Sequence, residues 1–246
     1  MNDERERYIN LALALSAEML KNGGETYRAE DCALRVLACG GWTDLQVTAI
    51  PTSVLVTASS DGRTVTRSRS VRVRSVDLEV IDRLNSISRA VSSGEMEPDE
   101  AFEAIGRGST PRPVWLLSLY SALSAALFTC LFGGGLTELL VALPIAFVSQ
   151  ICMRLIKKSV KYSFISSMLS SIFTAVCARC AAAFIPGLHI DSLIIGGIMP
   201  LLPGLSMTNA IRDTINGDLV SGSSRALESL LSAVAVAAGV GLVMAV

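Results

Sequence analysis

Five long runs without a charged residue follow residue 113, and they constrain the fold more than any other feature. A helix needs roughly 20 mostly apolar residues to cross a hydrocarbon core about 30 Å thick. Four of the runs approach that length, and the second does so if the side chain of Arg154 reaches the headgroups. The sequence therefore predicts five membrane helices, over Val114–Phe132, Leu139–Met153, Tyr162–Ala178, Ser192–Ile211 and Ser229–Val246.

Charge divides the 246-residue chain into two parts. Residues 1–112 hold 14 of the 21 Lys and Arg and 17 of the 22 Asp and Glu. This split predicts a cytoplasmic α+β domain at 1–112 and a transmembrane domain of five helices at 113–246. The charged N-terminus lacks the features of a signal peptide. Basic residues in alternate connections place the N-terminus inside, the C-terminus outside, and the chain in the cell (inner) membrane.

Helical and strand patterns alternate within residues 1–112. Helices are expected over 3–21, from Thr26 to Cys39, over 77–93 and after Pro98, with strands at 45–58 and 64–74. Basic residues recur at positions 67, 69, 72 and 74 of the second strand. A solvated strand face explains them best, ahead of a membrane-surface role and of nucleic-acid binding.

Helix breakers interrupt the fourth run. Pro200 and Pro203 donate no backbone hydrogen bond, and Gly204 leaves room for a close approach. Unpaired backbone survives in a bilayer only where protein or a wet cavity covers it, and transporters use such breaks to bind substrates. The break, with Asn209 just beyond it, favours a transport pathway over the alternative of a kinked packing helix.

Several charged residues are candidates for the same pathway. Arg212, Asp213, Asp218 and Arg225 are expected in the connection after the fourth run, as a gate, as a carboxylate-binding group or as ordinary loop charges. Arg179 lies about 17 residues into the third run, where a charge is costly. It is expected to bind a substrate carboxylate or an acidic partner, or to reach the outer headgroups.

Two motifs carry a resemblance to a known family. One is GETYRAED at 24–31, followed by the predicted hairpin, and the other is PLLPGLSMTNAIRD at 200–213, followed by Gly217, Asp218 and SGSSR at 221–225. Together they resemble the threonine/serine exporter family over nearly the whole chain. The resemblance implies export, with single-chain members associated with threonine and serine and split members with succinate. A chain of five helices resembles the larger subunit of a split system, which implies a smaller multi-span partner or a homo-oligomer.

These observations predict an exporter subunit for a small carboxylate or hydroxy-amino acid, coupled to an ion gradient because no nucleotide-binding motif is present. An alternative is a membrane-anchored hydrolase using Glu25, Tyr27 and Arg28 beside Thr26, and another is a regulatory scaffold. No nucleophile–base pair is recognisable, so no enzymatic activity is expected. A single histidine argues against a zinc site or histidine-based catalysis. Cys177 and Cys180 form a CARC pair that permits a redox or metal site, but no second CxxC or histidine cluster supports one, so both are expected to be packing residues and no metal or cofactor is expected. The expected partners are the substrate, the bilayer and another subunit, but no nucleic acid.

Overall fold

Two compact units make up the chain in the computed structural model, which describes residues 3–60, 62–72, 75–107, 112–159 and 163–245. The first unit comprises Met1–Thr110 and Leu205–Ala226. The second unit comprises Pro111–Gly204 and Leu227–Val246. The chain therefore passes between the units three times. The predicted division at residue 112 stays a prediction, and residues 205–226 belong to the first unit by their contacts.

Four helices of the first unit begin and end close to their predicted positions. They are α1 (Asp3–Lys21), α2 (Thr26–Cys39), α3 (Leu78–Ser92) and α4 (Pro98–Gly106). The turn between α1 and α2 requires a backbone φ of +86° at Gly23, which glycine adopts without strain. Asp77 caps α3 by accepting hydrogen bonds from the amides of Glu79 and Val80.

The three strands form one antiparallel sheet in the order β1-β2-β3. They are β1 (Thr43–Ile50), β2 (Ser53–Ser60) and β3 (Arg63–Ser70). The Val-, Thr- and Ile-rich pattern predicted one strand over 45–58, but Pro51 and Thr52 form a turn that separates β1 from β2. β3 ends at Ser70, so Arg72 follows the strand, and residue 74 lies outside the described residues.

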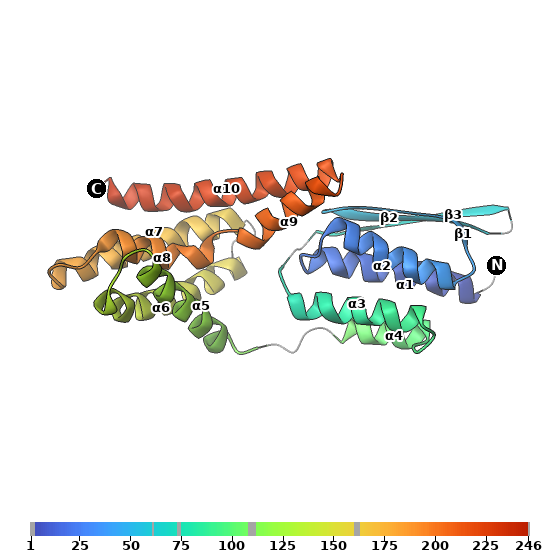
Figure 1. Cartoon of the computed structure of the whole chain (residues 1–246), viewed down its shortest axis with the longest axis horizontal. Helices are drawn as coiled ribbons and strands as arrows, with labels where there is room; N and C mark the ends of the chain where they lie inside the picture. The colour runs from blue at the N-terminus through green and yellow to red at the C-terminus, as the bar shows by residue number, and fades with distance from the viewer. Residues whose placement is uncertain (1–2, 61, 73–74, 108–111, 160–162, 246) are drawn as a thin grey trace. The chain divides into compact units, whose positions relative to one another are not determined.

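One face of the sheet contributes to the core of the first unit. Val54, Val56 and Ala58 of β2 are fully buried, as are Leu11 and Leu15 of α1. The elements lie side by side in Figure 1, with the sheet along α1 and α2. This alternation of buried and exposed positions is typical of a sheet covered on one face.

The second unit contains the apolar helices. They are α5 (Val114–Leu131), α6 (Leu136–Ser159), α7 (Ser163–Phe184), α8 (Ile190–Ile198), a 3-10 turn η1 (Met199–Leu201) and the later part of α10 (Leu219–Met244). In the described residues, four helices are long and apolar enough to cross a membrane, or five if the bent pair of α8–η1 and α9 (Gly204–Ile215) is one span. The chain is thus a helical membrane protein with four to five spans.

Small residues bring the apolar helices close together. Gly196 of α8 faces Thr129 of α5, and Gly239 of α10 faces Ser171 of α7. Side chains larger than hydrogen would not fit at either glycine without movement, since a Cβ would lie within 2.2 Å of a neighbouring hydroxyl oxygen. This packing through small residues is typical of membrane helices, which lack a hydrophobic driving force between them.

The helices extend further than the uncharged runs predicted. Arg212 and Asp213 lie within α9 and Arg225 within α10, although the sequence analysis placed them in a connection. Only the turn that contains Gly217 and Asp218 separates the two helices. The reason is that an uncharged run marks the apolar part of a helix, whereas the helix continues until a breaker or a turn ends it.

Candidate functional site

The turn between α1 and α2 presents backbone groups that neither helix uses. The carbonyl oxygens of Gly23 and Gly24 precede α2, and the amide of Thr26 is one of the unpaired donors at its first turn. Glu25 is the N-cap residue of α2, but its side chain makes no cap hydrogen bond. These groups are therefore open to partners from another element.

The α9–α10 hairpin supplies those partners. Asn209 donates from Nδ2 to the carbonyl oxygen of Gly23 at 2.8 Å. Oδ1 of Asp213 accepts from the amide of Thr26 at 3.2 Å and from its hydroxyl at 2.9 Å. The same hydroxyl lies 2.9 Å from Oδ2 of Asp218. A carboxylate from α9 thus performs the capping that the side chain of Glu25 does not.

Arg225 connects the first residues of α10 to the same turn. Its Nη2 donates to the carbonyl oxygen of Gly24 at 2.7 Å, and its Nε lies 3.1 Å from Oδ2 of Asp213. The Arg225 side chain is 9% exposed and that of Asp213 is fully buried. Charges removed from water in this way need partners. Asp213 is hydrogen-bonded through Oδ1 and Arg225 through Nη2, whereas Oδ2 and Nε lie close enough to form an ion pair but have no hydrogen-bond partner among the described residues.

Arg28 and Arg212 form the more exposed edge of this contact, where they pair with the buried carboxylate of Glu25. This carboxylate accepts from Nη1 of Arg212 at 2.8 Å and lies 3.3 Å from Nε of Arg28. Arg28 also lies over the Tyr27 ring, 6.0 Å from its centroid. Burial by itself would raise the pKa of Glu25, but hydrogen bonds from its own amide and from Arg212, with the charges of Arg28 and Arg212, lower it.

We call this arrangement the motif interface: residues 23–28 with Asn209, Arg212, Asp213, Asp218 and Arg225. It joins residues about 187 positions apart, and all of them belong to the first unit. The two motifs that were recognised separately in the sequence are therefore in direct contact. The hydroxyl of Thr26 meets two carboxylates rather than an imidazole, since the one histidine, His189, belongs to the second unit. This geometry suits attachment of the hairpin better than nucleophilic catalysis.

The helix breakers lie directly before the hairpin along the chain. Pro200 lies in η1, Leu202 is extended, and α9 begins at Gly204 after Pro203. A Cβ on Gly204 would meet no atom within 4 Å, so the space beside this glycine is open. The predicted interruption of the helix is present in the structure, and the open space leaves room for a ligand or another backbone.

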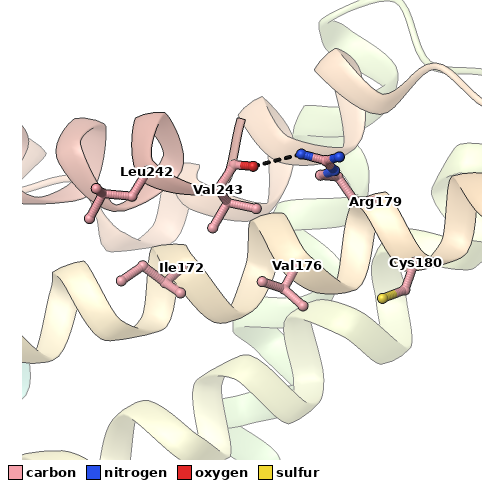
Figure 2. A pocket seen from close by; sticks show the side chains of 6 residues that line it. All are labelled: Ile172, Val176, Arg179, Cys180, Leu242 and Val243. Atoms are coloured by element: carbon pink, nitrogen blue, oxygen red, sulfur yellow. Dashed lines mark hydrogen bonds between the residues drawn. The ribbon is translucent and has the colours of Figure 1, made fainter. Parts of the chain in front are cut away.

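Arg179 is separate from the motif interface and belongs to the second unit. Figure 2 shows its guanidinium directed toward α10, where Nη1 donates to the carbonyl oxygen of Val243 at 2.7 Å. This contact satisfies a carbonyl in the last turn of α10, where a cation is favourable. Arg179 also lines an open cavity of about 380 Å³ whose other walls are Ile172, Val176, Cys180, Leu242 and Val243.

Two acidic residues in structural roles were missed by the sequence analysis. Glu30 accepts from the amide of Ala49 at 2.7 Å and lies near the hairpin. Glu138 is buried, and accepts from the amides of Gly135 at 2.8 Å and His189 at 3.0 Å. Glu138 was treated only as the boundary of an apolar run. The sequence did contain a signal for this role, because Glu138 follows the three glycines at 133–135 and lies in the first turn of the apolar helix α6.

The pKa of Glu30 moves in the opposite direction to that of Glu25. Burial raises the pKa of Glu30, the amide of Ala49 opposes that effect, and the negative charges of Asp218 and Asp213 add to it. A carboxyl group whose pKa is lowered in the folded state stabilises the fold above the ordinary glutamate pKa. This stability is lost as pH falls from that value through the lowered pKa. A raised pKa makes the folded state lose stability as pH rises from that value toward the raised one.

Glu25→Gln and Glu30→Gln should therefore change the pH dependence of thermal unfolding in opposite senses. Glu25→Gln removes a stabilising contribution that is present only at higher pH. The melting temperature of this variant should therefore fall relative to that of the native chain as pH rises. Glu30→Gln removes a cost present only at higher pH, so its relative melting temperature should rise. Melting curves of the purified full chain across the acidic range measure both. Shifts of the same sign in the two variants would contradict this assignment.

In the described residues, no group of three His, Cys, Asp or Glu side chains is placed to hold a metal ion. Cys177 and Cys180 are free thiols in α7. Cys180 lines the cavity beside Arg179.

Comparison with known proteins identifies relatives along the whole chain. A family model described as a putative threonine/serine exporter matches residues 10–246. A probable threonine/serine exporter of Mycobacterium tuberculosis is 27% identical over 240 residues, covering 95% of this chain and 45% of that protein. The probable succinate transporter subunit YjjP of Escherichia coli is 23% identical over 255 residues, covering 100% of this chain and 96% of that protein.

A third relative, the threonine/serine exporter of Corynebacterium glutamicum, is 29% identical over 174 residues, or 67% of this chain and 35% of that protein. The chain therefore spans about half or less of the two threonine/serine exporters and nearly all of the succinate transporter subunit. No solved structure matches the chain.

Proposed function

The chain belongs to the threonine/serine exporter family, a family of transporters, and from this premise we propose that it is one subunit of an exporter in the cell (inner) membrane. The proposed substrate is a small carboxylate or a hydroxy-amino acid: a succinate-like dicarboxylate, or threonine and serine. An ion gradient drives its movement outward. The N-terminus lies in the cytoplasm and the C-terminus outside.

The motif interface is the observation that carries this proposal. It holds the α9–α10 hairpin by an ion pair and by hydrogen bonds to the turn before α2. The hairpin is covalently continuous with the helix break at residues 200–204. An anchor needs neither a broken helix nor a fixed segment after it. A transporter needs both, because the irregular backbone binds substrate and the held segment limits how the break opens.

Different roles follow for the candidate residues. Pro200, Pro203 and Gly204 open the backbone to the substrate pathway, and Arg179 attracts the substrate carboxylate. Asn209, Arg212, Asp213, Asp218 and Arg225 act as a gate by holding or releasing the hairpin. Glu25, Thr26, Tyr27 and Arg28 supply the surface that the hairpin contacts.

A further subunit fits the exposed apolar surface of α5. Trp115, Leu119, Leu123 and Leu127 recur at every fourth position and are all more than 40% exposed. Such a stripe faces either lipid or another helix. Because YjjP is named as a transporter subunit, we assign the stripe to a smaller multi-span partner or to a second copy of this chain.

The hydrolase alternative is less well supported. The carboxylate of Glu25 is engaged by two guanidinium groups, from Arg28 and Arg212. A general base requires a carboxylate or imidazole within reach of a nucleophile and free to accept its proton. A regulatory scaffold would use the same motif interface but would need no broken helix.

An efflux assay tests the proposal in cells that express the chain alone or with a candidate multi-span partner. We expect lower intracellular succinate, threonine or serine, and a matching rise in the medium, when both polypeptides are present. Asn209→Ala should reduce this efflux severalfold, because the hairpin loses its bond to Gly23. Ile215→Ala, which changes an exposed side chain of the same helix, should leave efflux unchanged. Unaltered levels of all three compounds in every strain would overturn the proposal.

A further inference from the structure

A small polar cavity lies in the first unit where α1 and β3 both end. Its volume is about 220 Å³. Polar groups dominate its walls, which are Ala17, Glu18, Lys21, Arg69, Ser70, Val71 and Arg72. The volume is below the roughly 300 Å³ at which pockets for drug-sized ligands begin. It holds the equivalent of about seven water molecules at liquid density, so it suits a small polar ligand.

The cavity carries an excess of positive charge. Lys21 is paired with Glu18, with Nζ 3.0 Å from both carboxylate oxygens. Within the described residues, Arg69 and Arg72 have no hydrogen-bond or ion-pair partner. Among the described residues that line the cavity, two guanidinium groups and one ammonium group accompany a single carboxylate. Arg69 and Arg72 are exposed, so water and salt screen their mutual repulsion, and an anion bound between them would remove what is left of it.

The neighbouring arginine on β3 shows that the fold can supply a partner on this face. The guanidinium of Arg67 donates to the carboxylate of Glu6 at 3.2 Å and to the side-chain oxygen of Asn10 at 3.0 Å. Its charge is therefore paired within the fold. Arg67 and Arg69 are opposite Val56 and Val54 in the β2–β3 register, so both lie on the face that meets α1. Near Arg69, α1 contributes Glu18 and Lys21 to the cavity wall, and these two side chains pair with each other. Arg69 and Arg72 are therefore available to an anion from outside the fold.

We propose that this basic pocket binds a small dianion, either a dicarboxylate or a phosphate group. Planar guanidinium groups bind carboxylate and phosphate oxygens through two parallel hydrogen bonds, and Lys21 adds a point charge. The Ser70 hydroxyl is a further donor at the wall. The same chemistry recognises a soluble dianion and the headgroup of an anionic lipid. The inference does not depend on export, since it rests on the first unit alone.

Calorimetric titration of the detergent-purified full chain with succinate and with inorganic phosphate tests the pocket. We expect saturable binding of at least one of them, or of vesicles that contain an anionic phospholipid but not of neutral vesicles. Arg69→Gln and Arg72→Gln should each weaken binding about tenfold. Arg63→Gln, at the other end of β3 and outside the cavity, should have no effect. Melting temperatures without ligand show whether all three variants are folded.

Glu18→Gln provides a second, oppositely signed test. It frees Lys21 from its partner and should tighten binding severalfold. Asp82→Asn makes the same change of charge on α3, away from the cavity, and should not tighten binding. If binding of succinate or phosphate requires Arg69 and Arg72, the pocket is a site for a soluble anion. If only binding to anionic vesicles requires them, the pocket is a site for a lipid headgroup. Binding to neither, or binding that Arg69→Gln and Arg72→Gln leave unchanged, would overturn the proposal.

Discussion

Asp213→Asn should destabilise the first unit by about 3–5 kcal/mol, the cost of removing one member of a buried ion pair. Asp213 is fully buried, and the Arg225 side chain is 9% exposed. Asparagine keeps an oxygen that can accept from Thr26, so the main loss is the charge. Arg225 then remains buried with no carboxylate beside its Nε. Thermal or denaturant unfolding of the purified full chain measures the difference.

The exposed pair between Arg7 and Asp99 is a matched control. Its atoms are closer, at 2.7 Å, but the side chains are 47% and 69% exposed. Asp99→Asn should therefore cost at most about 1 kcal/mol. Combining Asp213→Asn with Arg225→Met should recover part of the loss, because the double variant has no unpaired buried charge. Equal stabilities for Asp213→Asn and Asp99→Asn would show that the motif interface does not hold the hairpin.

Gly196→Ala should disrupt packing in the second unit, with an expected loss of about 1–3 kcal/mol or more from overpacking. A Cβ at this position would lie 2.1 Å from the Thr129 hydroxyl oxygen and 2.5 Å from its backbone nitrogen. A side chain can rotate away, but the backbone of α5 cannot move without shifting the helix. The resistance of detergent-purified protein to unfolding, and its yield from the membrane, measure the effect.

Two further variants separate close packing from other effects of alanine. Gly241→Ala lies on α10 with no atom within 4 Å of the added Cβ, so it should leave stability nearly unchanged. Thr129→Ala removes the hydroxyl and the γ-methyl group but leaves the backbone nitrogen and Cα of residue 129 close to the added Cβ, so it should rescue Gly196→Ala only in part. A fully stable Gly196→Ala variant would mean that α5 and α8 do not approach as closely as described.

Local signals explain which elements could be predicted from the sequence. α1 and α2 begin and end at the predicted residues because the sequence Asn22-Gly-Gly stops one helix and α2 follows it directly. The break near Pro203 was predicted because proline removes a backbone donor wherever it occurs. α10 begins before the apolar run, since apolarity marks membrane crossing but not the start of a helix.

The pairing within the motif interface could not be read from the sequence. Asp213 and Thr26 are 187 positions apart, and no local pattern specifies that a carboxylate on α9 caps α2. The resemblance to a family drew attention to both motifs but not to their contact. Arg179 was correctly placed inside an apolar helix, yet its bond to Val243 depends on how α7 and α10 pack. Glu30 was overlooked because its neighbours Asp213 and Asp218 come from a distant segment.

Transport by purified components tests the exporter proposal most directly. Vesicles containing this chain and its candidate partner would be loaded with labelled succinate, threonine or serine, and release would be followed with and without an imposed proton gradient. We expect gradient-dependent release of at least one compound, and release near that of protein-free vesicles with Asp213→Asn. Release of all three compounds at the rate of protein-free vesicles, with both native polypeptides present and folded, would contradict the proposed function.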